Sequence, residues 1–170
     1  SRGGIWHRDA GGFELVEMDK ALTDVGLPVI CGDAAGRLFF ASGGYGLWQH
    51  DQNGWRKYSL GDSWKQGANM INDFVLDREG QGWLATASGV FRWDGESFAA
   101  FSILAPYPIF TLFQDQEGVM WFGSTGQGVF RWDGRELQHF TTQQGLVSDQ
   151  VYVIHQTPDG ALWFGTQAGL

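Results

Sequence analysis

A short segment built around an aromatic residue recurs four times in this chain, about every 42 residues. Phenylalanine or tryptophan occupies the same place in each copy, at positions 39, 83, 121 and 163. The copies are Leu38–Ser42, Gly82–Thr86, Met120–Ser124 and Leu162–Thr166. Periods of this length are typical of propellers and solenoids, in which similar units pack side by side. The repeat therefore limits the fold more than any single residue does.

A column of aspartates keeps the same phase as the aromatic column. Each aspartate precedes an apolar residue at the fourth following position and another at the seventh. The aspartates are Asp9, Asp51, Asp94 and Asp133. Agreement between separate columns indicates a true structural repeat rather than a chance spacing.

One period divides into four short runs, at residues 109–114, 119–124, 128–132 and 136–141. Each run is rich in β-branched or aromatic residues, and Asp and Gly residues suited to tight turns separate the runs. This pattern predicts a four-stranded antiparallel meander, whose strands we denote A to D. No segment has a long apolar period of 3.6 residues, so we expect almost no helix.

Four-stranded sheets packed face to face around an axis form a β-propeller, and we predict an all-β propeller with aromatic columns between neighbouring blades. A glycine opens each strand C, which divides the chain into repeat units. The units are strands C and D of a split blade (1–19), full blades at 20–60, 61–102 and 103–142, and strands A and B of a split blade (143–170). We expect one propeller region over 1–170, and a fragment or half of a larger ring.

The two half-blades are complementary, because one lacks the strands that the other supplies. Three arrangements satisfy their edges: a closed four-blade ring, a homodimer that completes a ring through its split blades, or a piece of a longer chain. A four-blade ring requires about 90° between blades, so symmetric seams or further residues are easier to accommodate. We expect the larger ring.

Composition excludes several classes of protein. The formal charge of −8 disfavours binding to a phosphate backbone, so no nucleic-acid partner is predicted. No apolar run is long enough to span a bilayer, so no membrane segment is predicted. Cys31 is the only cysteine, and we expect it to be a packed thiol. No cofactor is predicted.

Two stretches near the C-terminus resemble a known repeat. They are Asp115-Gln116-Glu117-Gly118-Val119-Met120-Trp121-Phe122-Gly123-Ser124 and Pro158-Asp159-Gly160-Ala161-Leu162-Trp163-Phe164-Gly165-Thr166, the latter preceded by Gly145-Leu146-Val147-Ser148-Asp149-Gln150-Val151. They resemble the two-component regulator propeller repeat, as do Arg92-Trp93-Asp94-Gly95 and Arg131-Trp132-Asp133-Gly134. The match is weaker where Phe39 replaces the tryptophan and where the lead-in is longer around Trp64.

The resemblance implies a periplasmic sensor region of a bacterial signalling protein, often a hybrid histidine kinase or a diguanylate cyclase. Such regions are usually built from seven-bladed propellers, and some members act as detectors of oligosaccharides. The resemblance therefore implies a non-catalytic propeller with a small-molecule or oligosaccharide ligand.

Propellers bind ligands at the mouth where the D-to-A and B-to-C loops gather, because packing occupies the sheets. Trp64 is the only tryptophan outside a repeating column, and it lies in the longest of these loops. An exposed indole flanked by amide and amine donors can stack on a flat ligand face. The predicted ligand-binding residues are Trp64, Lys65, Gln66, Asn69, Tyr45, Tyr107 and Asp73, the last expected to face a wet central channel. The alternative for Trp64 is a structural plug at the blade rim.

Catalytic and metal-binding patterns are weak, and we predict no catalytic residue and no metal ligand. No His or Cys pair has metal-ligand spacing, and the turns at 77–80 and 115–118 lack the alternating carboxylates of a calcium loop. One alternative is a lyase or hydrolase that uses His155 and Asp73 as acid and base. Another is a scaffold that docks a protein or its own second copy.

Overall fold

The computed structural model describes residues 5–9, 11–16, 29–42, 46–58 and 71–170. The strands form three four-stranded sheets and two two-stranded sheets. The first half of the chain contains β1 (Trp6–Asp9), β2 (Gly12–Leu15), β3 (Val29–Gly32), β4 (Leu38–Ser42), β5 (Gly46–Asp51), β6 (Gly54–Tyr58), β7 (Ile71–Leu76) and β8 (Gly82–Thr86). The second half contains β9 (Gly89–Trp93), β10 (Phe98–Ala100), β11 (Ile109–Gln114), β12 (Met120–Ser124), β13 (Val129–Trp132), β14 (Leu137–Phe140), β15 (Val151–Gln156) and β16 (Leu162–Thr166). Short 3-10 turns lie at Ser102–Leu104 (η2) and Thr142–Gln144 (η3).

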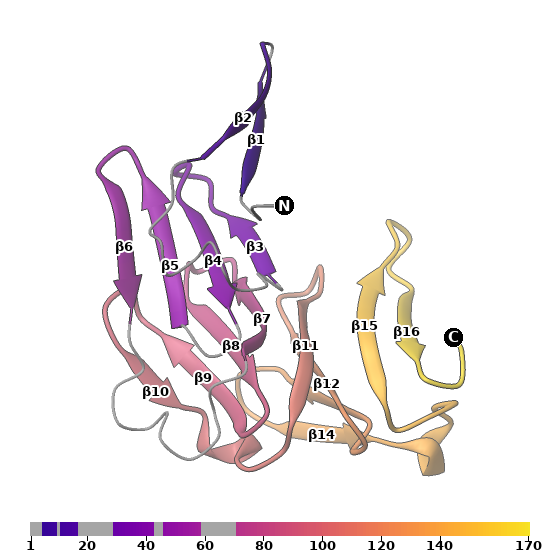
Figure 1. Cartoon of the computed structure of the whole chain (residues 1–170). Helices are drawn as coiled ribbons and strands as arrows, with labels where there is room; N and C mark the ends of the chain where they lie inside the picture. Colours follow the sequence, from indigo (N-terminus) through magenta and orange to yellow (C-terminus); the bar gives the residue numbers. More distant parts are fainter. Residues whose placement is uncertain (1–4, 10, 17–28, 43–45, 59–70) are drawn as a thin grey trace.

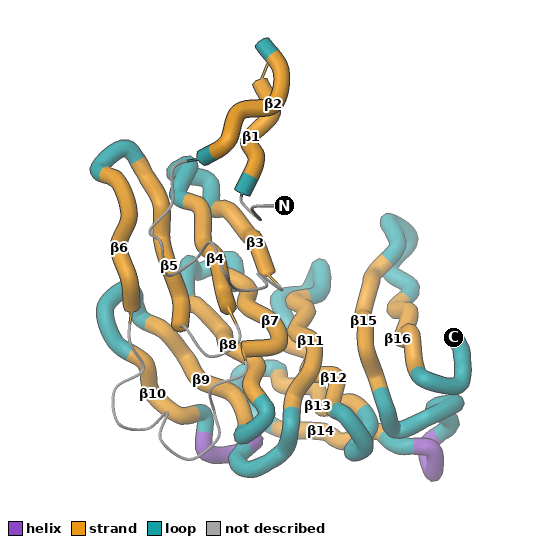
Figure 2. The backbone as a smooth tube through the Cα atoms, in the orientation of Figure 1, coloured by secondary structure: helices purple, strands orange, loops and turns teal. Residues whose placement is uncertain are grey.

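Each full sheet is an antiparallel meander of four consecutive strands, namely β3–β6, β7–β10 and β11–β14. The hairpins β1–β2 and β15–β16 stand at the two ends of the series. The sheets follow one another in an open arc, with β3, β7, β11 and β15 on its inner side (Figures 1 and 2). This is the all-β propeller arrangement predicted from the repeat. The strands of β11–β14 begin and end within a residue of the predicted runs.

The turn between strands A and B explains why an aspartate precedes Trp83 and Trp121 by six residues. Asp115 accepts hydrogen bonds from the backbone N–H groups of Glu117 and Val119 through Oδ1, at 2.9 Å each. Its Oδ2 accepts from the indole Nε1 of Trp121 at 2.7 Å. Asp77 makes the same bond to Trp83 at 2.8 Å. One carboxylate thus closes the turn and orients the ring, as expected for Asp in such turns.

The oriented rings pack forward against the next blade. Phe39 lies 5.6 Å from Phe74 between ring centroids, Trp83 lies 5.7 Å from Phe122, and Trp121 lies 5.6 Å from Phe164. Burial of such rings removes a large apolar area from water, which is the main favourable term in folding. The prediction that the aromatic columns fill the space between blades is confirmed for these three interfaces.

A hydroxyl at the end of strand B fastens the following turn. The Ser124 hydroxyl donates to the carbonyl oxygen of Gly128 at 2.9 Å and accepts from the N–H of Gln127 at 2.7 Å. Gly128 is required here because its φ is +73° and an added Cβ would overlap the carbonyl oxygen of Phe140. Thr86 bonds in the same way to the carbonyl oxygen of Gly89 at 2.9 Å.

The A–B turns of neighbouring blades are joined at the opposite end of the sheets. The N–H of Arg78 donates to Gln114 Oε1 at 2.9 Å, and the N–H of Gln116 donates to Gln156 Oε1 at 2.7 Å. The Arg78 guanidinium also donates to the carbonyl oxygens of Asp115 and Gln116. These bonds fix the angular step between blades at this rim. Within the described ranges, no helix has the length and apolar character needed to cross a bilayer.

Candidate functional site

The D–A and B–C connections meet at one end of the sheets, as predicted for the mouth. The N–H of Thr125, in a B–C turn, donates to the carbonyl oxygen of Pro108 at 3.1 Å. The N–H of Gly128 donates to the carbonyl oxygen of Asp149 in the connection to the next blade, at 2.8 Å. Backbone hydrogen bonds therefore join the loops of adjacent blades at the mouth and restrict their movement relative to one another.

Most of the predicted ligand-binding residues lie outside the described residues. These are Tyr45, Trp64, Lys65, Gln66 and Asn69. Tyr107 lies at the mouth as expected and is exposed, and its ring centroid is 5.0 Å from that of Phe130. A contact with ligand therefore stays a prediction for all six.

The side chain of Asp73 does not have the environment predicted for it, which was a wet central channel. Its Oδ2 accepts from the N–H of Leu112 at 2.7 Å and from the Thr111 hydroxyl at 3.3 Å, both on the next blade. Its Oδ1 accepts from the N–H of Phe74 at 2.8 Å. The carboxylate thus joins β7 to β11. The expectation failed because the neighbouring strand β11 supplies the N–H group of Leu112, and hydrogen bonds of this kind offset the cost of removing a carboxylate from water.

Burial sets the acidity of the groups at this interface. Loss of solvent raises the pKa of Asp73 above its ordinary value, although its hydrogen bonds act in the opposite direction. Burial, with added repulsion from Asp73 and Asp33, raises the pKa of the Cys31 thiol to about 11. Cys31 is half-buried and packs against the cluster between the first two full blades. It is therefore the packed thiol that the sequence predicted.

The structure separates the two residues of the enzyme alternative. His155 is exposed on β15, and Asp73 is on β7, with the whole blade β11–β14 between them in the arc (Figure 1). Both oxygens of Asp73 are already occupied by the contacts above. An acid and base that act on one bond must both reach it, and this pair does not share a site. In the described part of the chain, no cluster of three His, Cys, Asp or Glu side chains could hold a metal ion.

A β-bulge near the start of each of three inner strands exposes residues that sequence reasoning missed. The register shifts between Ile71 and Asp73, between Ile109 and Thr111, and between Val151 and Val153. The bulged residues are Asn72, Phe110 and Tyr152. Bulges re-aim side chains, and they are common beside functional sites. The signal in the sequence was an aromatic residue at the same place in two consecutive blades.

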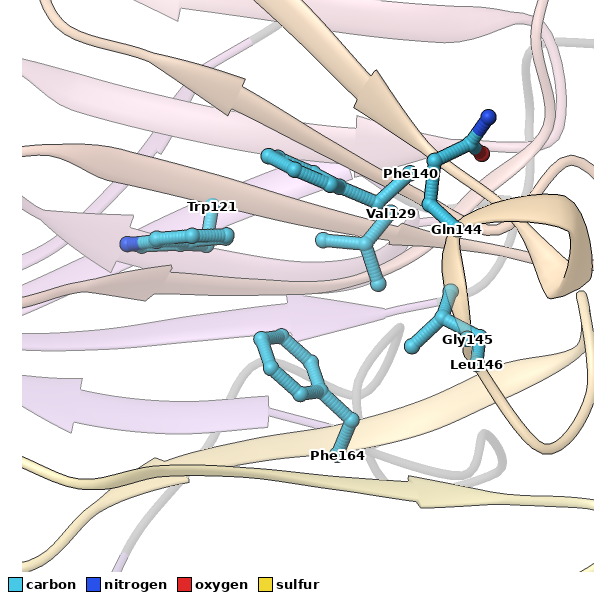
Figure 3. Close-up of a pocket in the computed structure, with 7 residues that line it drawn as sticks. All are labelled: Trp121, Val129, Phe140, Gln144, Gly145, Leu146 and Phe164. Atoms are coloured by element: carbon cyan, nitrogen blue, oxygen red, sulfur yellow. The ribbon is translucent and has the colours of Figure 1, made fainter.

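A cavity of about 270 Å³ lies between the blade β11–β14 and the hairpin β15–β16 (Figure 3). Trp121, Val129 and Phe140 line it from the blade, and Phe164 and Leu146 line it from the other side. Its walls are mostly apolar, and Gln144 is the polar side chain among the lining residues. It offers no convergent set of polar groups of the kind that orients a ligand.

The equivalent space at the preceding interface between blades is filled by side chains. Between β7–β10 and β11–β14, the cluster around Trp83 and Phe101 is filled by Phe130, Trp132 and Leu137 from strands C and D of the later blade. The sheet β15–β16 has only two strands in the described structure. The cavity therefore corresponds to the space that Phe130, Trp132 and Leu137 fill at the preceding interface, and its lining is that of a packing surface.

A family model described as two component regulator propeller matches residues 103–126 and 145–168. Each match covers the end of a D–A connection, strand A, the A–B turn and strand B, and the first match includes the Asp115 turn described above. Two segments of the chain are therefore similar to the two-component regulator propeller repeat.

Solved structures with this fold include extracellular domains of signalling proteins from B. thetaiotaomicron. That of BT4673, described as a hybrid two component system, has a TM-score of 0.81 and 17% identity, over 99% of this chain and 24% of that one. That of BT3049, with the same description, has a TM-score of 0.76 and 17% identity, over 99% of this chain and 23% of that one. At these identities the likeness shows the propeller fold.

Virginiamycin B lyase from Staphylococcus aureus shares the same architecture, with a TM-score of 0.74 and 14% identity over 95% of this chain and 59% of that one. This chain thus spans about a quarter of the two signalling domains and under two thirds of the lyase. A search of curated protein sequences gave no match.

Proposed function

We propose that this propeller is a non-catalytic sensor module of a bacterial two-component-type receptor, outside the cytoplasm, and binds a small molecule at its mouth. The observation that carries the proposal is the match of two repeats to the two-component regulator propeller model. The extracellular domains with the same fold support the location. An oligosaccharide is the ligand class that we test first.

The mouth supports ligand binding better than the other surfaces do. Its loops are held by backbone bonds, and rigid scaffolds that carry loops are the usual setting for binding sites. Trp64, Lys65, Gln66 and Asn69 belong to the longest of the predicted mouth loops. With Tyr45 and Tyr107 they form the set of proposed contacts.

Thermal-shift measurements over a broad library of oligosaccharides, peptides and small metabolites test this proposal. A ligand should raise the melting temperature of the wild type, since anything that binds only the folded state stabilises it. Trp64→Ala should lose the shift. Trp163→Ala removes an indole from β16, away from the mouth loops, and should keep it. Equal shifts in both variants would contradict the site, and no shift with any compound would contradict the function.

A specific observation favours a second candidate, assembly with another protein or another copy. Val153 and Trp163 on the hairpin β15–β16 are 53% and 49% exposed, although their counterparts in earlier blades face the next blade. Ile30 and Leu38 on β3–β4 are also exposed at the other end of the arc. A homodimer that completes the split blades would cover both faces. Sedimentation as a monomer at all concentrations would contradict self-assembly.

The lyase or hydrolase alternative has weaker support. The likeness to virginiamycin B lyase is at 14% identity and extends to the fold alone. The proposed pair, Asp73 and His155, stands on strands two blades apart. The sensor module accounts for the repeat match without requiring a catalytic group.

A further inference from the structure

The inner edge of the arc carries a row of side chains produced by the three bulges. Phe110 is 37% exposed and Tyr152 is 40% exposed, and their ring centroids lie 5.3 Å apart at an interplanar angle of 77°. Asn72, in the same place one blade earlier, donates from Nδ2 to the carbonyl oxygen of Ile109 at 2.7 Å. In successive blades the bulged residue is therefore first Asn72 and then an exposed aromatic residue, Phe110 or Tyr152. We call Phe110 and Tyr152 the inner aromatic pair.

Packing between blades does not account for the inner aromatic pair. Ile109 and Thr111, on either side of Phe110, are buried, and so is Val151 before Tyr152, whereas Val153 after it is 53% exposed. Because β11 pairs only with β12, the bulged residue lies on the free inner edge of its sheet. Packing between sheets leaves 37% of Phe110 and 40% of Tyr152 exposed along this edge.

Polar groups without charge surround the inner aromatic pair at the mouth. The Tyr152 hydroxyl donates to Gln150 Oε1 at 3.0 Å, and the carbonyl oxygen of Gln150 accepts from the N–H of Gln167 at 3.0 Å. Gln150 also pairs with Thr125 through an isolated β-bridge. Backbone contacts thus hold Thr125 and Gln167 next to Gln150, whose side chain contacts Tyr152, and both Thr125 and Gln167 are exposed.

Charged side chains are rare in the described segments at this end of the molecule. The described mouth segments, 87–88, 101–108, 125–128, 141–150 and 167–170, contain no Lys, Arg or Glu, and their single acid is Asp149. Asp149 is occupied by the N–H of Thr142 at 2.6 Å. The charged residues of the blades lie in the opposite turns, including Asp77, Arg78 and Glu79. An anionic ligand would find no cation among the described mouth residues and would approach a chain of net charge −8.

We propose that the inner aromatic pair is a stacking site for an uncharged saccharide, with Gln150, Gln167 and Thr125 bonding its hydroxyl groups. An aromatic face receives the apolar face of a sugar ring, and a few placed amides and hydroxyls fix its orientation. The inference rests on the proposed sensor function and deepens it, since it names the ligand class and adds contacts to the same mouth.

Calorimetry with two matched sets of probes tests the inference. The neutral set is cellohexaose, mannohexaose, maltohexaose and xylohexaose, and the anionic set is hexagalacturonate and a heparin hexasaccharide. At least one neutral probe should bind, with the anionic probes about tenfold weaker or worse, a difference of about 1.4 kcal/mol. The double variant Phe110→Ala/Tyr152→Ala should bind that neutral probe about tenfold more weakly or worse.

Two control variants separate stacking from a general effect on the mouth. Tyr152→Phe keeps the ring and loses the bond to Gln150, so it should bind the neutral probe more tightly than the double alanine variant does. Ile103→Ala removes another exposed apolar side chain from the β10–β11 connection and should have no effect. Melting curves show that each variant is folded.

The outcomes distinguish this inference from the sensor proposal. Wild-type affinity in the double variant, or anionic probes that bind as tightly as neutral ones, would overturn the inference and leave a ligand-binding propeller in place. If neither set binds, the saccharide site is overturned. The sensor function is then decided by the broader library and Trp64→Ala.

Discussion

Trp83 and Trp163 occupy the same place in two repeats but differ in burial, so replacing each by alanine measures what the aromatic column contributes. Trp83 is 4% exposed and packs against Phe101 and Phe122, at 5.3 and 5.7 Å between ring centroids. Trp163 is 49% exposed. The comparison keeps the residue type and the position in the strand constant.

The expected magnitudes follow from the buried areas. A tryptophan that buries roughly 150–250 Å² contributes about 4–6 kcal/mol at ~25 cal/mol/Å² before ordering costs, and measured Trp→Ala losses are about 3–5 kcal/mol. Trp83→Ala also leaves Asp77 Oδ2 without its indole partner and removes the ring beneath the Arg92 guanidinium. We expect a loss of about 3–5 kcal/mol for Trp83→Ala and about half of that for Trp163→Ala.

Urea denaturation followed by far-ultraviolet circular dichroism measures both free energies of unfolding. Thermal melts should show a fall of roughly 6–20 °C for Trp83→Ala, since each kcal/mol shifts the midpoint by about 2–4 °C at this size. A loss below about 1 kcal/mol for Trp83→Ala would refute the view that inter-blade aromatics hold the fold. Equal losses in the two variants would mean that a partner covers Trp163 in solution.

Three further predictions concern single contacts. Folding raises the pKa of Asp73, so the contribution of this side chain to stability is complete below its unfolded pKa and is lost as pH rises through the raised value. In urea titrations at several pH values, the difference in free energy of unfolding between wild type and Asp73→Asn should therefore shrink across that pH range. A difference that stays constant with pH would contradict this prediction. Ser124→Ala removes a buried hydroxyl that makes two hydrogen bonds and should cost about 1–2 kcal/mol by denaturation, whereas exposed Ser102→Ala should cost less than about 0.5 kcal/mol. Gly123→Ala places a Cβ 2.7 Å from Thr111 Cγ2 and should lower the free energy of unfolding by about 1–3 kcal/mol in the same assay. Adding Thr111→Ser removes that methyl group and should recover part of the loss. If stability does not recover, contact with Thr111 is not the source of the strain.

The strands were predictable because each is bounded by residues with a definite role in a turn. Asp115 and Gly118 form one turn, and Asp133 and Gly134 form another. The apolar runs between these turns are therefore best explained as strands. The order of the blades followed from the repeat alone. The forward packing of Trp83 and Trp121 followed from the need of each sheet to bury its aromatic face.

The bulges were not predictable, because the run Ile109 to Phe113 is apolar or β-branched throughout and shows no alternation to be broken. Asp73 was misplaced for a related reason. A carboxylate is expected to face water, and its donors, the N–H groups of Leu112 and Phe74, have no signature in the sequence. Contacts that depend on the backbone of another blade are visible only once the blades are assembled.

The forward packing of each aromatic column has a consequence for synthesis on the ribosome. As each sheet emerges, Phe39, Trp83 and then Trp121 await the next sheet, which covers them in turn. Domains and repeats fold as units while the chain is being made, and exposed apolar surface is what draws nascent chains into aggregates. In this protein a growing chain presents about one bare sheet face at a time, so its vulnerability to aggregation should not increase with the number of repeats already completed.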